Sequence, residues 1–418
     1  MARSPLTRED AVALRRRVGA CLGARALART SFVWPVVVPF YARFAELSPS
    51  GAFWLVAAYV LGGLVADRPG AHLVHRFGRR SSLIAATGAS AAACALVLVG
   101  AEPISFAIGQ LLLGAARAVQ DAALPGLLAA TLADFGQDED APSLEDRAVS
   151  LETTVMLGSA LLSGVLLESW VLAPYLFTLV AAAGALACAV LLDEPRRSAR
   201  KPGRREVSMA TREIARAPAL ARSVLFGAIA AALSLVVRFA QQPFLESVGC
   251  PLALLGALAA VAGALRVAAR HWDGGALRER WLTGPMSWIA APWLAVLGMA
   301  VVPHPAIGLL ALLRGGGDGT RARDLDRVLD ALVAAPYRPA AEAAIAIAAR
   351  AGALVAAVLL AVLADSLGLA WALGVLALAA LSSTLLVAWL PLRPAPPHEG
   401  DRVDIVVAPP RGGPVRRS

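Results

Sequence analysis

Residues 67–80 read DRPGAHLVHRFGRR and form a short charged stretch between two long apolar ones. Helices that cross a bilayer are joined by turns outside the hydrocarbon, and Lys and Arg gather in the turns on the cytoplasmic side. Arg76, Arg79 and Arg80 close this stretch, directly before the next apolar run. The stretch is therefore typical of the cytoplasmic end of a helical hairpin in a membrane.

The composition of the whole chain also favours a membrane protein. Of its 418 residues, 58% are hydrophobic and only 17% are charged, which is more apolar surface than a soluble fold could cover with polar groups. A helix needs about 20 apolar residues to cross a hydrocarbon core of about 30 Å. The chain holds twelve such windows, at residues 18–42, 52–74, 81–101, 104–133, 148–168, 171–192, 222–246, 251–270, 281–302, 304–334, 339–364 and 368–391.

These windows are expected to be helices. They are rich in Ala, Leu and Val and lack the two-residue alternation of a barrel strand. Unpaired backbone amides are not tolerated in lipid, so a continuous apolar window must satisfy them as a helix. The sequence therefore predicts an all-α membrane protein with twelve transmembrane helices.

The distribution of Arg gives the expected orientation. Basic residues gather before the first window, in the turn after the second, and most densely between the sixth and the seventh. By the positive-inside rule these segments and both termini are cytoplasmic. Topology thus accounts for the net charge of +9, and a nucleic-acid partner is not expected. Since Lys201 is the only lysine and no targeting feature is present, we expect a multi-pass protein of a bacterial inner (plasma) membrane.

The basic segment between the sixth and seventh windows divides the chain. We expect an N-terminal six-helix half at 1–192, a cytoplasmic linker at 193–221, a C-terminal six-helix half at 222–391 and a disordered cytoplasmic tail at 392–418. The tail is rich in Pro, Gly and Arg and lacks the apolar residues needed to bury a core.

The opening stretch resembles the loop signature of the major facilitator superfamily. That signature runs Gly, three residues, Asp, Arg, any residue, Gly, Arg, Arg. Its places are taken here by Ala71, His75, Arg76, Gly78, Arg79 and Arg80, and an upstream acid-Pro-x-Gly pattern is approximated by Asp67, Pro69 and Gly70. Ala71 and His75 depart from the signature. The resemblance implies two six-helix halves with a solute site between them near the midplane. It also implies a secondary active transporter that works by alternating access.

The resemblance also implies a gating loop. Its expected members are Asp67, His75, Arg76, Gly78, Arg79 and Arg80. In the family the acid at the place of His75 is thought to lock the inner gate by pairing with neighbouring helix ends. A neutral His75 cannot form that pair, and a charged one would repel Arg, so the lock is expected to be weaker here.

The fourth window carries the densest group of polar residues. Its run GAARAVQDAALPG, at 114–126, resembles the fourth-span pattern of the superfamily, with Arg117 and Gln120 matching and Asp121 in place of Gly. Arg117 and Asp121 are four residues apart and share a helix face. Two interpretations stay open: an internal ion pair that allows the Arg to be buried, or a site for solute charge or proton coupling.

Other polar residues fall inside the seventh, tenth and eleventh windows. The candidates for substrate binding or coupling are Arg117, Gln120, Asp121, Arg238, Gln241, Gln242, Arg314 and Arg350. At mid-depth, Arg117, Arg238 and Arg350 face one acid, Asp121, which leaves a surplus of two positive charges. Such a surplus favours an anionic, zwitterionic or amphipathic solute. Every third window lacks Asp, Glu, Lys and Arg, which places those helices toward lipid in the superfamily plan.

The tenth window is irregular. Its continuous apolar part ends at Leu313, and RGGGDGTRARD follows. We expect either a helix broken by these glycines beside a cavity, or a short span followed by an amphipathic helix on the surface.

Enzyme chemistry is not expected. The five histidines are scattered, the four cysteines are isolated, and neither HExxH nor Gly-x-Ser-x-Gly occurs. No metal and no cofactor are expected. The expected partners are a small-molecule solute, the lipid bilayer and, as an open alternative, protons. A non-transporting scaffold or sensor with a transporter fold stays open as a second function, because an altered loop signature fits it.

Overall fold

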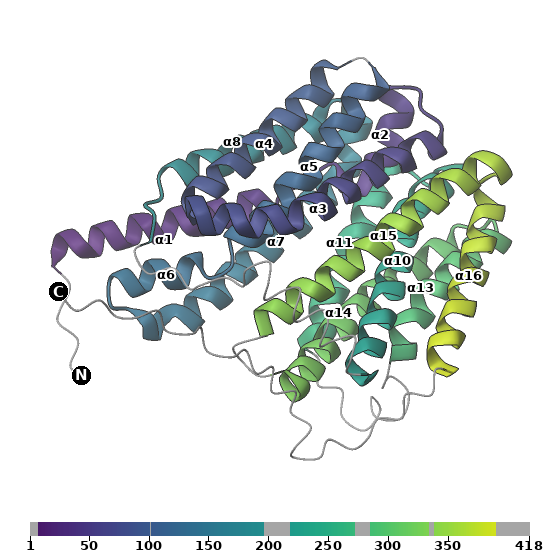
Figure 1. Cartoon of the computed structure of the whole chain (residues 1–418). Helices are drawn as coiled ribbons and strands as arrows, with labels where there is room; N and C mark the ends of the chain where they lie inside the picture. Colours follow the sequence, from purple (N-terminus) through teal and green to yellow (C-terminus); the bar gives the residue numbers. More distant parts are fainter. Residues whose placement is uncertain (1–6, 101, 196–217, 272–284, 334–337, 390–418) are drawn as a thin grey trace.

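The computed structural model describes residues 7–100, 102–195, 218–271, 285–333 and 338–389, and in these ranges the chain is built of helices (Figure 1). The helices of the N-terminal half are α1 (Arg8–Arg29), η1 (Trp34–Val36), α2 (Val37–Phe44), α3 (Pro49–Phe77), α4 (Arg79–Val99), α5 (Pro103–Ala123), α6 (Leu127–Asp134), η2 (Asp138–Asp140), α7 (Ala141–Ser169) and α8 (Ala173–Val190). Those of the C-terminal half are α10 (Pro218–Ser247), α11 (Leu252–His271), α13 (Pro285–Val301), α14 (Ala306–Leu332), α15 (Arg338–Leu367) and α16 (Leu369–Trp389).

All twelve predicted windows contain helix. Within the described residues, ten helices are long and apolar enough to cross a membrane. The exceptions are α13, which has 17 residues, and α14, whose apolar part is interrupted by charge. The expected linker and tail lie largely outside the described residues, so the division of the chain at 193–221 and at 392 stays a prediction.

Two of the predicted spans are interrupted. The first consists of α1 and α2, separated by the segment 30–36, where Pro35 supplies no backbone N–H to continue α1. The fourth consists of α5 and α6, separated at Pro125 and Gly126, and Gly126 has a φ of +72°. Both interruptions free backbone groups inside the bundle, and polar side chains of other helices bind near both.

The expectation for the tenth window is wrong on both alternatives, because α14 is one continuous helix of 27 residues. Its glycines have a packing role. A Cβ on Gly315 would lie 2.0 Å from the carbonyl oxygen of Ala262, and a Cβ on Gly319 would lie 2.3 Å from that of Arg266. Glycine therefore allows α14 to pack directly on the backbone of α11, and this packing supports the helix through its polar stretch.

Glycine allows the same close packing between the second and fourth spans of the N-terminal half. A Cβ on Gly62 of α3 would lie 2.0 Å from the carbonyl oxygen of Leu111, and one on Gly114 of α5 would lie 1.9 Å from that of Tyr59. The pair α3 and α5 thus corresponds to the pair α11 and α14. In this pair of helices the two halves are alike.

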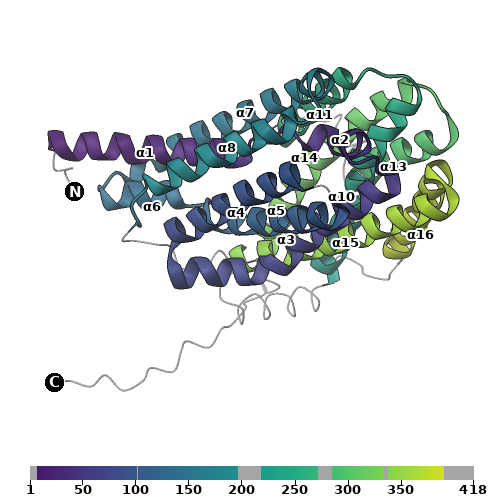
Figure 2. The same cartoon turned by 90° about the horizontal axis from the view of Figure 1, so that it is seen from above.

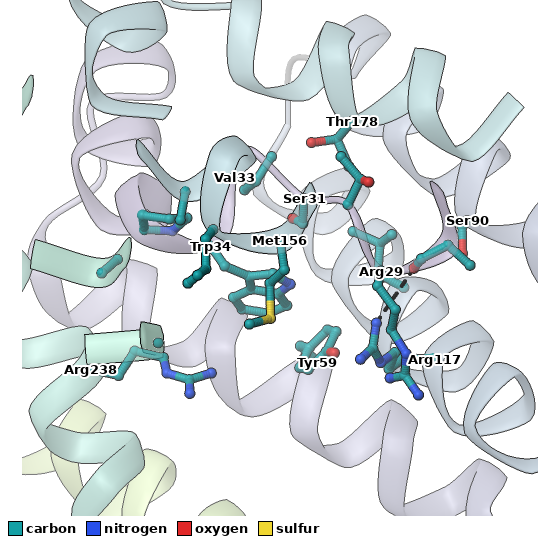
Figure 3. A pocket seen from close by; sticks show the side chains of 18 of the residues that line it. Arg29, Ser31, Val33, Trp34, Tyr59, Ser90, Arg117, Met156, Thr178 and Arg238 are labelled. Atoms are coloured by element: carbon teal, nitrogen blue, oxygen red, sulfur yellow. Dashed lines mark hydrogen bonds between the residues drawn. The ribbon is translucent and has the colours of Figure 1, made fainter. Parts of the chain in front are cut away.

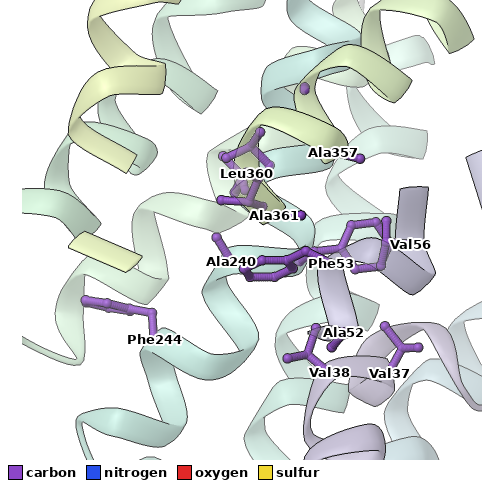
Figure 4. Packing of buried hydrophobic residues seen from close by; sticks show 14 of the residues in the cluster. Val37, Val38, Ala52, Phe53, Val56, Ala240, Phe244, Ala357, Leu360 and Ala361 are labelled. Carbon is purple, nitrogen blue, oxygen red and sulfur yellow. The ribbon is translucent and has the colours of Figure 1, made fainter. Parts of the chain in front are cut away.

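The two halves share a hydrophobic core at one side of the bundle only. We call the side where α1 begins and α16 ends the terminal side. The largest buried cluster combines residues of both halves, among them Phe53 of α3, Phe244 of α10 and Leu360 of α15 toward the opposite side (Figure 4), and it extends within the C-terminal half to Val387 near the end of α16. The two other clusters lie toward the terminal side, and each belongs to one half, around Leu83 and around Leu329. Among the described residues, the hydrophobic contacts between the halves therefore lie toward the opposite side.

Polar contacts close the opposite side as well. The Ser50 hydroxyl, at the start of α3, donates to Asp365, near the end of α15, over 3.2 Å. The backbone N–H of Ala253 in α11 donates to Glu168 of α7 over 3.1 Å. Toward the terminal side the helices of the two halves diverge, with α1 and α6 at the far end of the N-terminal half (Figures 1 and 2). Among the described residues, the two halves are therefore in contact on the opposite side, and their helices diverge toward the terminal side.

Candidate functional site

A cavity of about 360 Å³ lies between the two halves where they begin to separate. The helices α1, α5, α10 and α14 line it, and α3, α7 and α11 contribute as well. Residues of α4 and α8, which belong to the charge-free spans expected toward lipid, also reach it through Ser90 and Thr178. The cavity is therefore lined by both halves.

The middle of the cavity is aromatic and apolar. Trp34, in the interruption of the first span, lies edge-on to Tyr59 with ring centroids 4.2 Å apart and to Phe239 with centroids 5.7 Å apart. Met156 lines the cavity as well (Figure 3). These side chains offer a polarisable surface on which the flat or apolar part of a ligand can pack.

Gln242 ties this aromatic surface to the C-terminal half. Its Oε1 accepts from the backbone N–H of Val38 over 2.9 Å, and its Nε2 donates to the carbonyl oxygen of Trp34 over 3.1 Å. Gln242 thereby satisfies backbone groups that the interruption of the first span leaves free. Gln241, also buried, lines the cavity beside it.

On the N-terminal wall, Arg29 and Arg117 line the cavity (Figure 3), and both bind one carboxylate. Arg29 Nη1 lies 2.6 Å and Arg117 Nε 3.3 Å from Oδ1 of Asp121. Asp121 does not itself line the cavity. Its other oxygen, Oδ2, accepts from Nη2 of Arg350 over 2.8 Å. Three guanidinium groups from three helices therefore meet at Asp121.

The ion pairs continue in both directions from Asp121. Arg29 Nε also lies 2.8 Å from Glu152 of α7, Glu152 pairs with Arg25 over 2.9 Å, and Arg25 pairs with Glu145. At the other end, Arg350 pairs with Asp67 of α3. In this network, four arginines face four carboxylates: Arg25, Arg29, Arg117 and Arg350 against Asp67, Asp121, Glu145 and Glu152. The N-terminal wall is thus close to charge balance.

The C-terminal wall has a different charge. Arg238, Arg266 and Arg314 line the cavity there together with one acid, Asp318. Asp318 accepts from the Ser234 hydroxyl over 2.8 Å and pairs with Arg321 over 3.2 Å. The surplus of positive charge predicted for the cavity is therefore located on the C-terminal wall.

The candidate residues from the sequence divide into two groups. Arg117, Gln120, Arg238, Gln241, Gln242 and Arg314 line the cavity. Asp121 and Arg350 lie behind the wall, in the ion-pair network. Gln120 is buried and donates to the Ser90 hydroxyl over 3.0 Å. The sequence analysis did not select Arg29, Arg266 or Asp318 for the site. Each is an ionisable residue within a predicted span, and that position alone could have identified it as a candidate.

The residues of the loop signature connect helix ends within the N-terminal half. Arg79 is buried, and its Nη1 donates to the carbonyl oxygens of Ala123, over 3.2 Å, and Pro125, at the interruption between α5 and α6. Arg80 Nη2 donates to the last turn of α8, at the carbonyl of Val190, over 3.0 Å. Arg76 is exposed and stacks on the ring of Phe77. The side chain of His75 lies outside the described part of the structure.

The turn between α3 and α4 is capped by an acid that sequence reasoning missed. Glu194 accepts from the backbone N–H groups of Arg79, over 2.6 Å, and Arg80, over 2.9 Å, at the start of α4. Gly78 has a φ of +87°, and a Cβ there would lie 2.5 Å from the Glu194 carboxyl carbon. Glycine is needed at this position for the backbone conformation and for the approach of the carboxylate.

Comparison with known proteins agrees with this architecture. A family model described as the Major Facilitator Superfamily matches residues 20–320. No curated protein matches the sequence. Similar solved structures include the nucleoside transporter NupG (TM-score 0.69, 8% identity, covering 90% of this chain and 98% of that one). An auto-inhibited peptide transporter of the POT family has a TM-score of 0.68 and 13% identity, covering 89% of this chain and 96% of that one.

A further similar structure is that of a bacterial homologue of the human lysosomal transporter Spinster, in an inward-facing and unoccupied conformation. Its TM-score is 0.67 at 15% identity, covering 92% of this chain and 96% of that one. At such identities the likeness establishes the fold and not the solute.

Proposed function

This chain belongs to the Major Facilitator Superfamily of membrane transporters, and from that premise we propose that it moves a small solute across the membrane by alternating access. The observation that carries the proposal is the cavity between the halves, lined by both of them and closed on one side. A rocking motion of one half against the other would expose such a cavity to each side in turn.

The terminal side is proposed to face the cytoplasm. The α3–α4 turn with Arg76, Arg79 and Arg80 lies there, and Arg in short turns favours the cytoplasmic side. The state with separated terminal ends is then the one open to the cytoplasm. The localisation that follows is a cell inner membrane with both termini inside.

The proposed solute is a small anion with an apolar part. Five arginines and one acid line the cavity: Arg29, Arg117, Arg238, Arg266 and Arg314 against Asp318. In Figure 3, Trp34, Tyr59 and Met156 are seen between Arg238 on one side and Arg29 and Arg117 on the other, and all six line the cavity. An amphipathic anion complements both parts, whereas a cation would meet repulsion from either wall.

Proton coupling is proposed to act through Asp121. This carboxylate holds Arg29, Arg117 and Arg350. A proton on Asp121 would remove the charge that links the cavity arginines to α15, so protonation and solute binding would influence the same contacts.

Flux in proteoliposomes tests the proposal. The full chain is reconstituted, and uptake of radiolabelled organic anions, neutral compounds and cations is measured with and without a pH gradient, with protein-free liposomes as the control. Saturable uptake of anions is expected. Binding without flux of any compound would instead favour the scaffold or sensor function.

A further inference from the structure

Arg314 has an unusual environment for a cation. Its side chain is buried, with 5% relative exposure, yet it lines the cavity. Within the described residues, its Nε and Nη1 atoms have no hydrogen-bond partner. Buried guanidinium N–H groups without acceptors are costly, and such groups in a native protein normally mark a missing acceptor.

Nearby charges increase this need for an anion. Arg238 and Arg266 line the same wall and interact electrostatically with Arg314. Their side chains are exposed to the cavity. Among the described residues, no carboxylate forms an ion pair with Arg238, Arg266 or Arg314. Three like charges therefore share one part of the wall.

Asp318 does not balance them. The carboxylate is within reach of this wall, but its Oδ1 is already bound by Ser234 and by Arg321 of its own helix. Counting Arg321 with the three wall arginines gives four positive charges and one negative one. By contrast, the network on the N-terminal wall has as many carboxylates as arginines. The unmatched charge belongs to α10, α11 and α14 alone.

We propose that Arg314, together with Arg238 and Arg266, forms a subsite that binds the oxyanion group, a carboxylate or a phosphate, of the transported solute. The rest of the solute lies along Phe239 and Trp34, since Phe239 follows Arg238 on α10 and its ring faces Trp34. This inference rests on the proposed function and adds the wall that recognises the charge. The N-terminal arginines, already paired, have the lesser role in binding.

The chemistry of the group supports this assignment. Guanidinium donors match the oxygens of carboxylates and phosphates in geometry, and they bind them more strongly inside a protein than in water. An oxyanion would supply Arg314 with the acceptors it lacks and would reduce the repulsion among the three arginines. A carboxylate would leave a larger positive surplus than a phosphate, so a phosphate monoester should bind more tightly.

Binding to the purified full chain tests the subsite. The probes are phenyl phosphate, benzoate, inorganic phosphate, benzyl alcohol and benzylamine, and calorimetry measures their affinities at one ionic strength. Phenyl phosphate is expected to bind best, followed by benzoate. Inorganic phosphate should bind more weakly because it lacks the ring. Equal affinity for benzyl alcohol and benzoate would overturn the proposal.

Variants distinguish binding at the C-terminal wall from a general attraction of anions to the positively charged protein. Arg314→Gln and Arg266→Gln are each expected to weaken phenyl phosphate binding by about 10- to 100-fold, the effect of a lost charged hydrogen bond. The matched control is Arg270→Gln, one turn along α11 from Arg266, where the side chain is exposed and pairs with Asp326. It should bind as the parent does. Equal losses in Arg266→Gln and Arg270→Gln would overturn the subsite.

Folding and transport are followed separately. Arg314→Lys keeps the charge and is expected to keep part of the affinity. If Arg314→Gln does not fold, Arg314→Lys serves as the test of the subsite. If the anions bind in an Arg314-dependent manner but no compound is transported, the subsite stands and the proposed function fails. If a compound is transported and neither Arg314 variant changes its uptake or its binding, the subsite fails and the transport function stands.

Discussion

Arg350 of α15 donates to Asp121 of α5, with Nη2 2.8 Å from Oδ2, and so joins the C-terminal half to the N-terminal half. The two residues lie in different halves of the chain, and no local pattern relates them. Asp121 also holds Arg29 and Arg117, which line the cavity. A change at Asp121 should therefore affect the cavity wall and the contact between the halves together.

Asp121→Asn should destabilise the protein. The substitution keeps the shape but removes the charge shared by three arginines, of which Arg29 keeps Glu152 and Arg350 keeps Asp67. Breaking a fully buried pair costs about 3–5 kcal/mol, and because the Asp121 side chain is 32% exposed we expect about 1–3 kcal/mol. Denaturant unfolding in detergent measures this loss of unfolding free energy.

The control for Asp121→Asn is Asp326→Asn, which breaks the exposed pairs of Asp326 with Arg270 and Arg338 and should cost less than about 1 kcal/mol. The double variant Arg117→Ala, Asp121→Ala should recover only part of the loss, since Arg29 and Arg350 still lack Asp121. Full recovery would show that the pair of Arg117 and Asp121 is independent of the other two arginines.

The fold followed from the sequence more fully than the site did. Apolar length located ten spans that are long and apolar enough to cross a membrane, because lipid imposes that length on each span. The ion pair of Arg117 and Asp121 was visible because spacing along one helix relates them. The partners Arg29 and Arg350 come from other helices, and their meeting depends on packing that no local pattern encodes. The glycines of α14 were misread because the backbone of α11, which they contact, is likewise distant in sequence.

Gly315→Ala should disrupt the packing of α14 on α11. The added methyl group would lie 2.0 Å from the carbonyl oxygen of Ala262, so the helices must move apart. The neighbour Gly316 has open space at the same place and is the matched control. Gly316→Ala should be neutral or stabilising by up to about 1 kcal/mol, because Ala favours helix, whereas Gly315→Ala should cost about 1–3 kcal/mol. Equal melting temperatures of the two variants would contradict the close approach.

Glu194→Ala should weaken the turn between α3 and α4. The carboxylate accepts from two N–H groups at the start of α4, and losing an anionic cap of this kind costs about 1–2 kcal/mol. Asp193→Ala is the control, since Asp193 is exposed and pairs with Arg17 alone among the described residues. It should cost less than about 1 kcal/mol. Proteolysis at the turn, faster in Glu194→Ala only, would report the same difference locally.

Orientation in the membrane is open to a direct test. Glu46 lies between α2 and α3, Glu102 precedes α5, and Glu168 lies near the end of α7, so all three are on the side opposite the terminal side. Reporters fused after these residues should therefore read as outside, and those after Lys201 and Arg402 as inside, if Arg sets the orientation. A phosphatase and a fluorescent protein, active on opposite sides, give two independent readouts for each fusion. An outside signal at Lys201 would show that the orientation is the reverse of the one proposed. The terminal side, where the helices of the two halves diverge, would then face the cell exterior.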